Sequence, residues 1–440
     1  MKPVLQVALD HVTLERALKA AREALAGGAD WVEAGTPLIK SEGLEAVRAL
    51  RREFPQATVV ADMKIADAGR METECAAKAG ANVVHLLALA SDSTIREAVE
   101  AARRYDVRLA ADMIGMPDRD HLVRRARELE AMGVSFICVH TPIDLQMQGK
   151  LPFDDLRAVS SAVAVPVAVA GGINSESVVD AVEAGASIVI VGGAITNAPD
   201  AQKAAAAIRK AMTTGVRVAT DRFKRGDESQ IASVLAKASA ADVSDALHFS
   251  GSVAGLRAIV PGVKTAGPAL TVWTYPGDWA KPVEAIDVAP EGSVLVIDAG
   301  GRPPAVWGEK ATKSAIQRRL AGVVINGAIR DTASIREMRF PAFARQVCPC
   351  AGDPKGQGMI EAPLHFGGQR IHTGDWIVGD DDGVVVIPKE KVLEVANRAQ
   401  SVVEREEREM AEISRGSTLG KVSELIRWEH QRKKDAKKEE

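Results

Sequence analysis

Eight short apolar runs recur along the first part of the chain at intervals of about 21 to 31 residues. Between them lie stretches such as TLERALKAAREAL and IREAVEAARRY, whose apolar residues are spaced by three and four positions, as in amphipathic helices. The eight runs are LQVALD (5–10), WVEAG (31–35), TVVADMK (58–64), VVHLLAL (83–89), RLAADM (108–113), FICVH (136–140), PVAVAGG (166–172) and IVIVGG (188–193).

This alternation of strand and helix predicts right-handed crossovers and a parallel sheet. Eight strand–helix units within about 210 residues fit a closed barrel better than an open doubly wound sheet. The sequence therefore predicts an α/β fold, a (β/α)₈ barrel, for the N-terminal part of the chain.

A chain of 440 residues is too long for one ordinary core, and its second half has a different rhythm. Strand-like runs separated by Gly-Asp and Gly-Gly turns enclose one clear helix at about 309–320. We expect a barrel over 1–212, a helical linker over 213–242, a second domain over 243–390, and a charged helix and tail over 391–440. The strand-like runs are VKTAGPALTVWTY, SVLVIDAGG, GVVINGA, PAFARQV, GQRIHTGDWIVGD and GVVVIP.

The composition excludes several classes of function. A net charge of −3 and an aromatic content of 4% argue against nucleic-acid binding, which needs a basic surface or stacking side chains. No signal peptide and no apolar stretch of membrane-spanning length is evident. We expect a soluble, cytoplasmic protein whose four cysteines are reduced thiols.

Charged residues gather where the predicted barrel strands end, which is where such barrels place catalytic groups. In Asp62-Met-Lys64-Ile-Ala-Asp67, strand alternation points Asp62 and Lys64 to the same side. Lys64, flanked by carboxylates, stays charged and suits the stabilisation of an enediolate oxygen. Glu33 ends the second strand, and with Asp62 it offers the carboxylate oxygens that Mg²⁺ or Mn²⁺ prefers.

Further candidates lie at the other strand ends. His140 is the candidate acid–base residue, Asp144 a substrate-binding residue, and Asp10 a hydrogen-bonding support for Lys64 or a sugar hydroxyl. His85 is expected to pack against or support the site. Two glycine pairs close the seventh and eighth strands, where barrels commonly bind phosphate through backbone N–H groups; they are Gly171, Gly172, Gly192 and Gly193.

The second half carries a constellation of its own. Gly308 precedes a helix, so the backbone N–H groups from Gly308 through Glu309 to Lys310 are expected to hold a carboxylate. Arg330 can bind the same anion or an enolate oxygen, and Asp331 can serve a divalent ion.

The first-half motifs LQVALD, EAGTPLIK, ADMKIADAG, HTPIDLQMQG, VAVAGGI and IVIVGGAIT resemble the orotidine-monophosphate-decarboxylase superfamily, and most closely its 3-hexulose-6-phosphate synthase branch. The resemblance covers the whole predicted barrel. It implies a homodimer and Mg²⁺-dependent aldol addition of formaldehyde to ribulose 5-phosphate, the one-carbon chemistry of the ribulose monophosphate pathway. It further implies that Glu33 and Asp62 serve the metal, that Lys64 steadies the enediolate, and that Asp67 acts near the site across the dimer interface.

A sister branch remains the alternative. The 3-keto-L-gulonate-6-phosphate decarboxylases share Glu33, Asp62, Lys64, Asp67 and His140, and they usually carry an arginine three residues after that histidine. Ile143 stands at this position here, and the difference favours the synthase.

The second half, from VSDAL (243–247) through GDWIVGDDDGVVVIP (374–388), resembles the RraA-like family, which includes metal-dependent oxo-acid aldolases. That resemblance implies a swivelling β/β/α fold, trimeric assembly, a 2-oxo acid as substrate, and roles in enolate chemistry for Arg330 and Asp331. Ser334 stands where the aldolases usually place an acid, so both readings stay open for this domain: a metal-dependent oxo-acid lyase, or a regulator of ribonuclease activity and oligomerisation scaffold. Dimeric barrels joined to trimeric second domains predict a hexamer.

Overall fold

The computed structural model describes residues 3–423, so the charged tail expected at HQRKKDAKKEE lies outside the described residues. The chain divides into two compact units. Among the described residues, the first comprises 3–146, 150–225 and 404–423, and the second comprises 147–149 and 226–403. Each unit is described by itself below.

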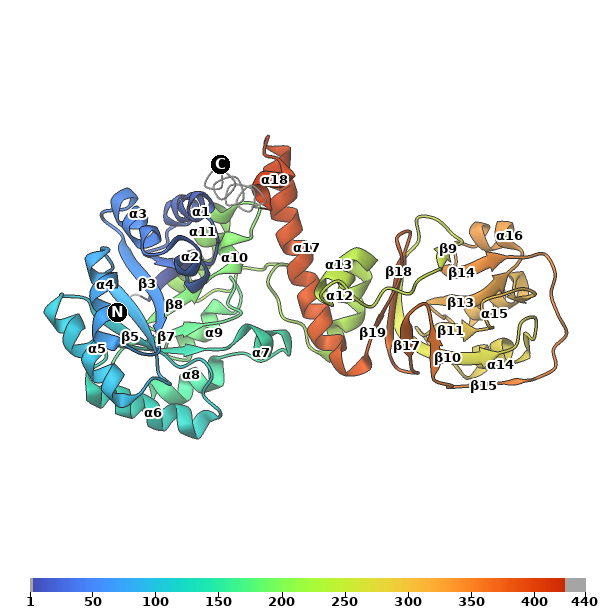
Figure 1. Ribbon diagram of the computed structural model, residues 1–440, viewed down its shortest axis with the longest axis horizontal. Helices are drawn as coiled ribbons and strands as arrows, with labels where there is room; N and C mark the ends of the chain where they lie inside the picture. Colours follow the sequence, from blue (N-terminus) through green and yellow to red (C-terminus); the bar gives the residue numbers. More distant parts are fainter. Residues whose placement is uncertain (1–2, 424–440) are drawn as a thin grey trace, which may run out of the picture. The chain divides into compact units, whose positions relative to one another are not determined.

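The first unit is a closed barrel of parallel strands in chain order, in which β1 pairs with both β2 and β8. In Figure 1 the strands lie inside a ring of helices. The predicted (β/α)₈ barrel is confirmed. The strands are β1 (Val4–Leu9), β2 (Trp31–Ala34), β3 (Thr58–Ile65), β4 (Val83–Leu87), β5 (Arg108–Asp112), β6 (Phe136–His140), β7 (Val167–Ala170) and β8 (Ile188–Val191).

The helices between the strands cover the outside of the barrel. Small side chains on the inner face of α1 let it lie close to the strands, and Ser91 caps α5 by accepting the Thr94 N–H. The helices are α1 (Leu14–Ala26), α2 (Thr36–Glu42), α3 (Glu45–Glu53), α4 (Gly69–Lys78), α5 (Asp92–Arg104), α6 (Arg119–Met132), α7 (Ile143–Met147), α8 (Phe153–Ser160), α9 (Val178–Glu183), α10 (Gly193–Thr196) and α11 (Ala201–Thr214).

Two apolar layers form the barrel's core. One lies between strands and helices, and the other fills the interior with side chains such as Val60, Val83, Cys138 and Ile190. Because apolar side chains fill the lower interior, the polar residues at the strands' carboxyl ends are the ones left to face the open end.

The second unit is built on a mixed sheet of order β19-β18-β10-β11-β13-β14-β9, with β12 beside β13 and β15 beside β10. This nearly closed mixed sheet confirms the predicted RraA-like fold. Its strands are β9 (Arg257–Ala258), β10 (Thr265–Thr274), β11 (Val294–Asp298), β12 (Ala305–Trp307), β13 (Gly322–Ile329), β14 (Ala342–Val347), β15 (Gly358–Ile360), β18 (Trp376–Asp380) and β19 (Gly383–Ile387), with a separate hairpin of β16 (Leu364–Phe366) and β17 (Gln369–Ile371).

Helices pack against one face of this sheet, and the hairpin of β16 and β17 packs against the other. The run GQRIHTGDWIVGD, expected as one strand, is divided into β17 and β18 because a turn at 372–375 lets the His372 N–H donate to Asp375. The helical elements are η1 (Glu228–Gln230), α12 (Ile231–Lys237), α13 (Ala240–Ala246), α14 (Ala280–Val288), α15 (Glu309–Gln317), α16 (Thr332–Glu337) and η2 (Lys389–Lys391).

The long amphipathic helix α17 (Val392–Ser414) follows the last strand, and α18 (Leu419–Val422) comes after it. Its first half packs with α12, α13, β18 and β19 in a core that includes Val395 and Ala399. The division between the two units falls within this helix, after Val403. Within residues 3–423, no helix combines the length and apolar character needed to span a membrane.

Candidate active site

Lys64 is held between two carboxylates at the open end of the barrel. Its Nζ lies 2.9 Å from Oδ2 of Asp62 and 2.9 Å from Oδ2 of Asp112. Although burial lowers it, the charges of these carboxylates raise the pKa of Lys64 above its ordinary value. The ammonium is therefore fully charged and fixed in place. The backbone of Lys64 adopts a left-handed conformation with φ of 47°, an uncommon state that contributes to this placement.

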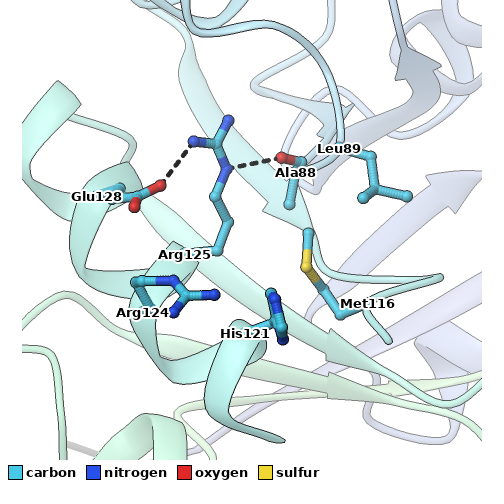
Figure 2. A pocket seen from close by; sticks show the side chains of 7 residues that line it. All are labelled: Ala88, Leu89, Met116, His121, Arg124, Arg125 and Glu128. Atoms are coloured by element: carbon cyan, nitrogen blue, oxygen red, sulfur yellow. Dashed lines mark hydrogen bonds and ion pairs between the residues drawn. The ribbon is translucent and has the colours of Figure 1, made fainter. Parts of the chain in front are cut away.

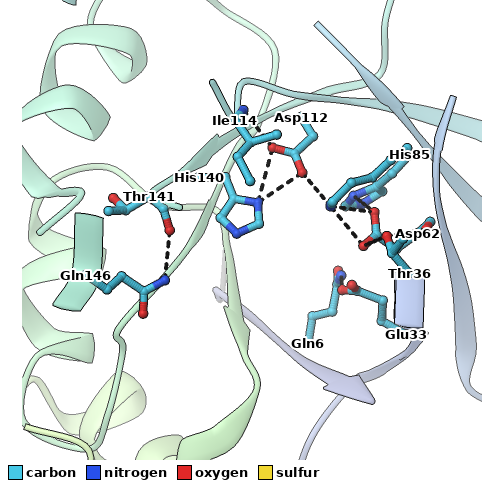
Figure 3. A network of polar contacts seen from close by, with 11 residues as sticks. Gln6, Glu33, Thr36, Asp62, His85, Asp112, Ile114, His140, Thr141 and Gln146 are labelled. Atoms are coloured by element: carbon cyan, nitrogen blue, oxygen red, sulfur yellow. Dashed lines mark hydrogen bonds and ion pairs between the residues drawn. The ribbon is translucent and has the colours of Figure 1, made fainter. Parts of the chain in front are cut away.

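Asp112 joins the lysine to the histidine, and its contact with His140 is drawn in Figure 3. Its Oδ2 lies 3.0 Å from Nδ1 of His140, and its Oδ1 accepts the Ile114 N–H at 3.0 Å. Burial opposes ionisation, but the hydrogen bond from His140 and the charges of His140 and Lys64 hold the pKa of Asp112 well below its usual range. A carboxylate at Nδ1 fixes the tautomer that donates from Nδ1, leaving Nε2 as a proton acceptor.

Acidic side chains crowd the adjoining side of the barrel. Glu33 is buried and accepts a short hydrogen bond from Gln6, while Thr36 donates to Oδ2 of Asp62 at 2.7 Å. Burial, then the charges of Asp62 and Asp10, raise the pKa of Glu33 well above its ordinary value. The same two causes, desolvation by the barrel wall and the charge of Asp62, raise the pKa of Asp10, although its side chain is accessible from the open end. These carboxylates destabilise one another's charge.

Such a group of hard oxygen donors fits a divalent cation, which would relieve the repulsion. Asp62, His85 and Asp112 also offer ligand atoms within 4.8 Å of one another. However, the Lys64 ammonium already bridges the two aspartates, so a second cation between them would be repelled. Glu33 and Asp62 are the remaining donor pair, although Lys64 also contacts Asp62. Burial lowers the pKa of His85, so this side chain is a neutral support beside Asp62.

The glycine pairs lie at the ends of β7 and β8 as expected. Gly171 has φ of 109°, and a Cβ there would lie 2.7 Å from the carbonyl oxygen of Thr141, so only glycine fits. Gln146 lies against the same pair and donates to that Thr141 carbonyl at 2.8 Å (Figure 3). At β8, a Cβ on Gly192 would lie 3.5 Å from Oδ2 of Asp10. The structure thus brings Asp10 beside the second glycine pair.

Two predicted residues lie outside this network within a single chain. Asp67 is exposed, and its Oδ1 accepts the N–H of Ala68 at 2.7 Å. Asp144 is exposed in α7. Conversely, our sequence reasoning did not assign roles to Asp112, Thr36 and Gln6. The position of Asp112 at a strand end was a usable signal, whereas the roles of Thr36 and Gln6 depend on neighbours from other strands.

An open pocket of about 240 Å³ lies at the loops that follow β4 and β5. In Figure 2, Arg125 extends between Glu128 and the carbonyl oxygen of Ala88, which it reaches at 2.9 Å. None of the residues that line this pocket belongs to the Lys64–Asp112–His140 network, so the pocket is not the active site. The lining residues are Ala88, Leu89, Met116, His121, Arg124, Arg125 and Glu128.

In the second unit, Asp331 directly precedes α16, and its side chain reaches the start of α15. Its Oδ2 accepts the Glu309 N–H at 3.1 Å and lies 3.6 Å from Nε of Arg330. A Cβ on Gly308 would meet that Asp331 oxygen at 2.6 Å, which explains the glycine. The structure therefore gathers Gly308, Glu309, Arg330 and Asp331 as expected, while Lys310 follows in the first turn of α15. Hydrogen bonds from Lys313 and Ser334 lower the pKa of Glu309.

Comparison with known proteins gives matches to both units. A family model described as Orotidine 5'-phosphate decarboxylase / HUMPS family matches residues 3–208, and an RraA-like model, described as Aldolase/RraA, matches 240–386. The chain is 39% identical over 212 residues to the 3-hexulose-6-phosphate synthase of Bacillus subtilis, covering 48% of this chain and 99% of that protein. It is 44% identical over 209 residues to the Staphylococcus haemolyticus protein of the same name, covering 47% and 98%. A crystal structure of 3-hexulose-6-phosphate synthase aligns at 39% identity over 48% of this chain and 99% of that one, with a TM-score of 0.45.

The closed barrel with its lysine, carboxylates and histidine, and relatives of this name, define an enzyme of the lyase class. The chain belongs to the Orotidine 5'-phosphate decarboxylase / HUMPS family through its N-terminal domain, and the relatives reported above are 3-hexulose-6-phosphate synthases. It carries an RraA-like domain fused after it.

Proposed function

We propose that the barrel is a 3-hexulose-6-phosphate synthase, which adds formaldehyde to ribulose 5-phosphate or runs the same aldol reaction in reverse. The observation that carries the proposal is the Lys64 ammonium, fixed at 2.9 Å from both Asp62 and Asp112 where an enediolate oxygen can reach it. The relatives are named 3-hexulose-6-phosphate synthase, which supports a phosphosugar reactant.

In the proposed reaction, the backbone N–H groups of the two glycine pairs hold the substrate phosphate. Nε2 of His140 removes a proton from C1, and the electron pair moves toward O2 to form the enediolate. Lys64 stabilises the charge that develops on that oxygen. C1 then attacks the formaldehyde carbon, and the new alkoxide takes the proton back from His140.

Mg²⁺ or Mn²⁺ held by Glu33 and Asp62 would supply Lewis-acid polarisation of the substrate oxygens. Burial, and then repulsion among these carboxylates, raise the pKa values of Glu33 and Asp10, and the repulsion supports a cation there. Asp67 is proposed to act across a barrel dimer, since it is exposed rather than part of the network of its own chain.

The test is consumption of ribulose 5-phosphate by the full chain with formaldehyde and Mg²⁺. Lys64→Ala should lower kcat by about 10³-fold or more, the loss expected when a charge-stabilising group is removed. Lys78→Ala is the matched control, since Lys78 is an exposed partner of Glu74 in α4. Release of CO₂ from 3-keto-L-gulonate 6-phosphate, without the aldol reaction, would instead assign the barrel to the decarboxylase branch.

For the RraA-like domain we propose a metal-dependent oxo-acid lyase, on the juxtaposition of Arg330, Asp331 and the first turn of α15. Oxaloacetate decarboxylation is the assay, with Asp331→Asn as the inactive variant. If the full chain releases no pyruvate, the domain acts as a regulatory module or an oligomerisation scaffold. Light scattering tests the proposed assembly: we expect six times the 46.6 kDa chain mass, and a monomer would contradict it.

A further inference from the structure

After α11, the chain runs back along the loop that follows β7. In this return segment, residues 216–225, the Val218 N–H donates to the carbonyl of Ser175 at 3.1 Å, and the Ser175 hydroxyl donates to the Val218 carbonyl at 2.8 Å. The Thr220 N–H donates to Glu176 at 2.8 Å. The return segment is thereby fixed to the loop after β7, which begins with the first glycine pair.

Both backbone polar groups of Phe223, in the return segment, make buried hydrogen bonds. The Phe223 φ of 53° lies in the left-handed region, which is strained for a bulky residue. Its N–H donates to Oε1 of Glu404 at 2.7 Å, and its carbonyl accepts from Nδ2 of Asn174 at 3.0 Å; both bonds are buried. With the side chain 8% exposed, these contacts fix both the backbone and the ring.

The ring of Phe223 packs against the second glycine pair. A Cβ on Gly193 would lie 3.2 Å from Cε1 of Phe223, so the ring contacts this glycine directly. Asn174, which holds the Phe223 carbonyl, comes two residues after Gly172. One residue therefore contacts both loops to which we assign the substrate phosphate.

The C-terminal half of α17 binds the Phe223 backbone and the segment after α10. Glu404, which accepts the Phe223 N–H, opens this half. Four residues on, the buried Arg408 donates to the carbonyl of Ala198, just beyond α10, at 2.7 Å, and pairs with Glu412 at 2.7 Å. Its guanidinium also lies 3.2 Å from Glu23 in α1. The helix half is thus attached to the barrel next to the loop after β8.

Both segments lie outside the part of the chain that its relatives share. The family match ends at residue 208, and the aligned Bacillus subtilis protein is covered over 99% of its length. We propose that the return segment and the C-terminal half of α17 position the phosphate loops, with Phe223 as the positioning residue. This proposal rests on the proposed phosphate site. The two segments are also the places where the chain passes between its two units, after 225 and before 404.

The test measures the Kd of inorganic phosphate by calorimetry, together with KM and kcat for ribulose 5-phosphate, all on the full chain. Phe223→Ala should weaken phosphate binding and raise KM by about tenfold, with kcat changed less than about twofold, since loop misplacement affects binding before chemistry. Phe223→Tyr, which keeps the ring, should restore both values. Met410→Ala is the control, because Met410 lies in the C-terminal half of α17 but is 61% exposed.

A coupling test follows from the contact with Gly193. The Cβ of Gly193→Ala presses on the ring, so its effect on phosphate affinity should be several-fold smaller in a Phe223→Leu background than in the wild type. Phe223→Leu also serves if Phe223→Ala fails to fold. Equal phosphate affinity in folded Phe223 variants and additive effects would overturn the positioning role. If the wild-type chain binds no phosphate, the proposed phosphate site fails, and this proposal with it.

Discussion

The Lys64 ammonium lies 2.9 Å from the carboxylate of Asp112, a residue 48 positions further along the chain. Asp112 also holds Nδ1 of His140 at 3.0 Å, so one buried carboxylate orients both the cation and the base of the proposed reaction. We therefore expect Asp112→Asn to lower kcat by about 10²–10⁴-fold, the range of a general acid–base contribution, with a smaller change in KM. Asp118→Asn, an exposed helix cap, is the control for the same chemical change. Near-normal kcat in folded Asp112→Asn would remove Asp112 from the mechanism.

Metal removal tests whether a divalent cation binds between the carboxylates of Glu33 and Asp62. Burial, then the charges of Asp62 and Asp10, raise the pKa of Glu33. A divalent cation would relieve the repulsion between these carboxylates and should therefore stabilise the folded barrel at neutral pH. At a Mg²⁺ concentration of about 100 Kd the gain is about 2.7 kcal/mol, measurable as a rise in Tm. Chelation should abolish activity, and Mg²⁺ or Mn²⁺ should restore it.

In Glu33→Gln, the Mg²⁺-dependent rise in Tm should largely disappear, because one of the two proposed ligands has lost its charge. The control is Glu53→Gln, a surface partner of Arg22. An equal Mg²⁺ response in both variants would place the cation elsewhere.

His11 gives a pH dependence of stability. Its Nε2 is buried and has no hydrogen-bond partner among residues 3–423. Burial, then the charges of Arg16 and Arg408, lower the pKa of His11 to about 4, against the opposing charge of Glu412. The unfolded chain, with a histidine pKa of about 6.5, binds the proton more readily. The contribution is therefore complete above pH 6.5 and is lost as the pH falls toward 4, by at most about 3 kcal/mol.

The measurement compares wild type with His11→Gln between pH 7 and 4, using hydrogen exchange of the barrel strands. Since the variant lacks this titration, its protection should fall less steeply over the window, whatever other groups contribute to both. Parallel curves for the two proteins would show that His11 titrates normally.

Two glycines with nearly equal φ angles separate backbone strain from substrate binding. Gly172 has φ of 69° and Gly215 has φ of 67°, and a Cβ would meet nothing closer than 3.5 Å at either. Replacement by alanine should cost each about 1 kcal/mol of stability. Only Gly172→Ala should raise KM for ribulose 5-phosphate, because a side chain there hinders the close approach of phosphate. Equal KM values would argue against phosphate at this loop.

The second domain can be tested without disturbing the barrel. A Cβ on Gly308 would meet Oδ2 of Asp331 at 2.6 Å and Cγ of Arg330 at 3.1 Å, so Gly308→Ala must displace both side chains. We expect loss of oxaloacetate decarboxylation and unchanged synthase activity. Gly262→Ala, whose Cβ would meet nothing within 4 Å, is the control. Retained decarboxylation in Gly308→Ala would exclude the Arg330–Asp331 pair from that reaction.

The amino-acid sequence alone predicted the barrel, because eight strand runs with helical spacing between them admit few architectures. It also predicted which residues end the strands, since the carboxyl ends of parallel strands meet on one face. Hence Glu33, Asp62, Lys64 and His140 could be named as candidate site residues. Arg330 and Asp331 could be named as a pair because they are adjacent in the chain. The RraA-like fold followed from resemblance, because its short strands alone carry too little periodicity to define their pairing order.

Tertiary structure decided how these residues interact. Strand alternation gives the side of Lys64 but not its partner: Asp112 becomes that partner because β3, β4 and β5 are neighbours and the barrel curves their ends together. No sequence motif pointed to Phe223, because its proposed positioning role depends on contacts with Asn174, Gly193 and Glu404, the last of them 181 residues away. Local pattern fixes elements and faces, whereas contacts between distant segments arise only when the chain packs.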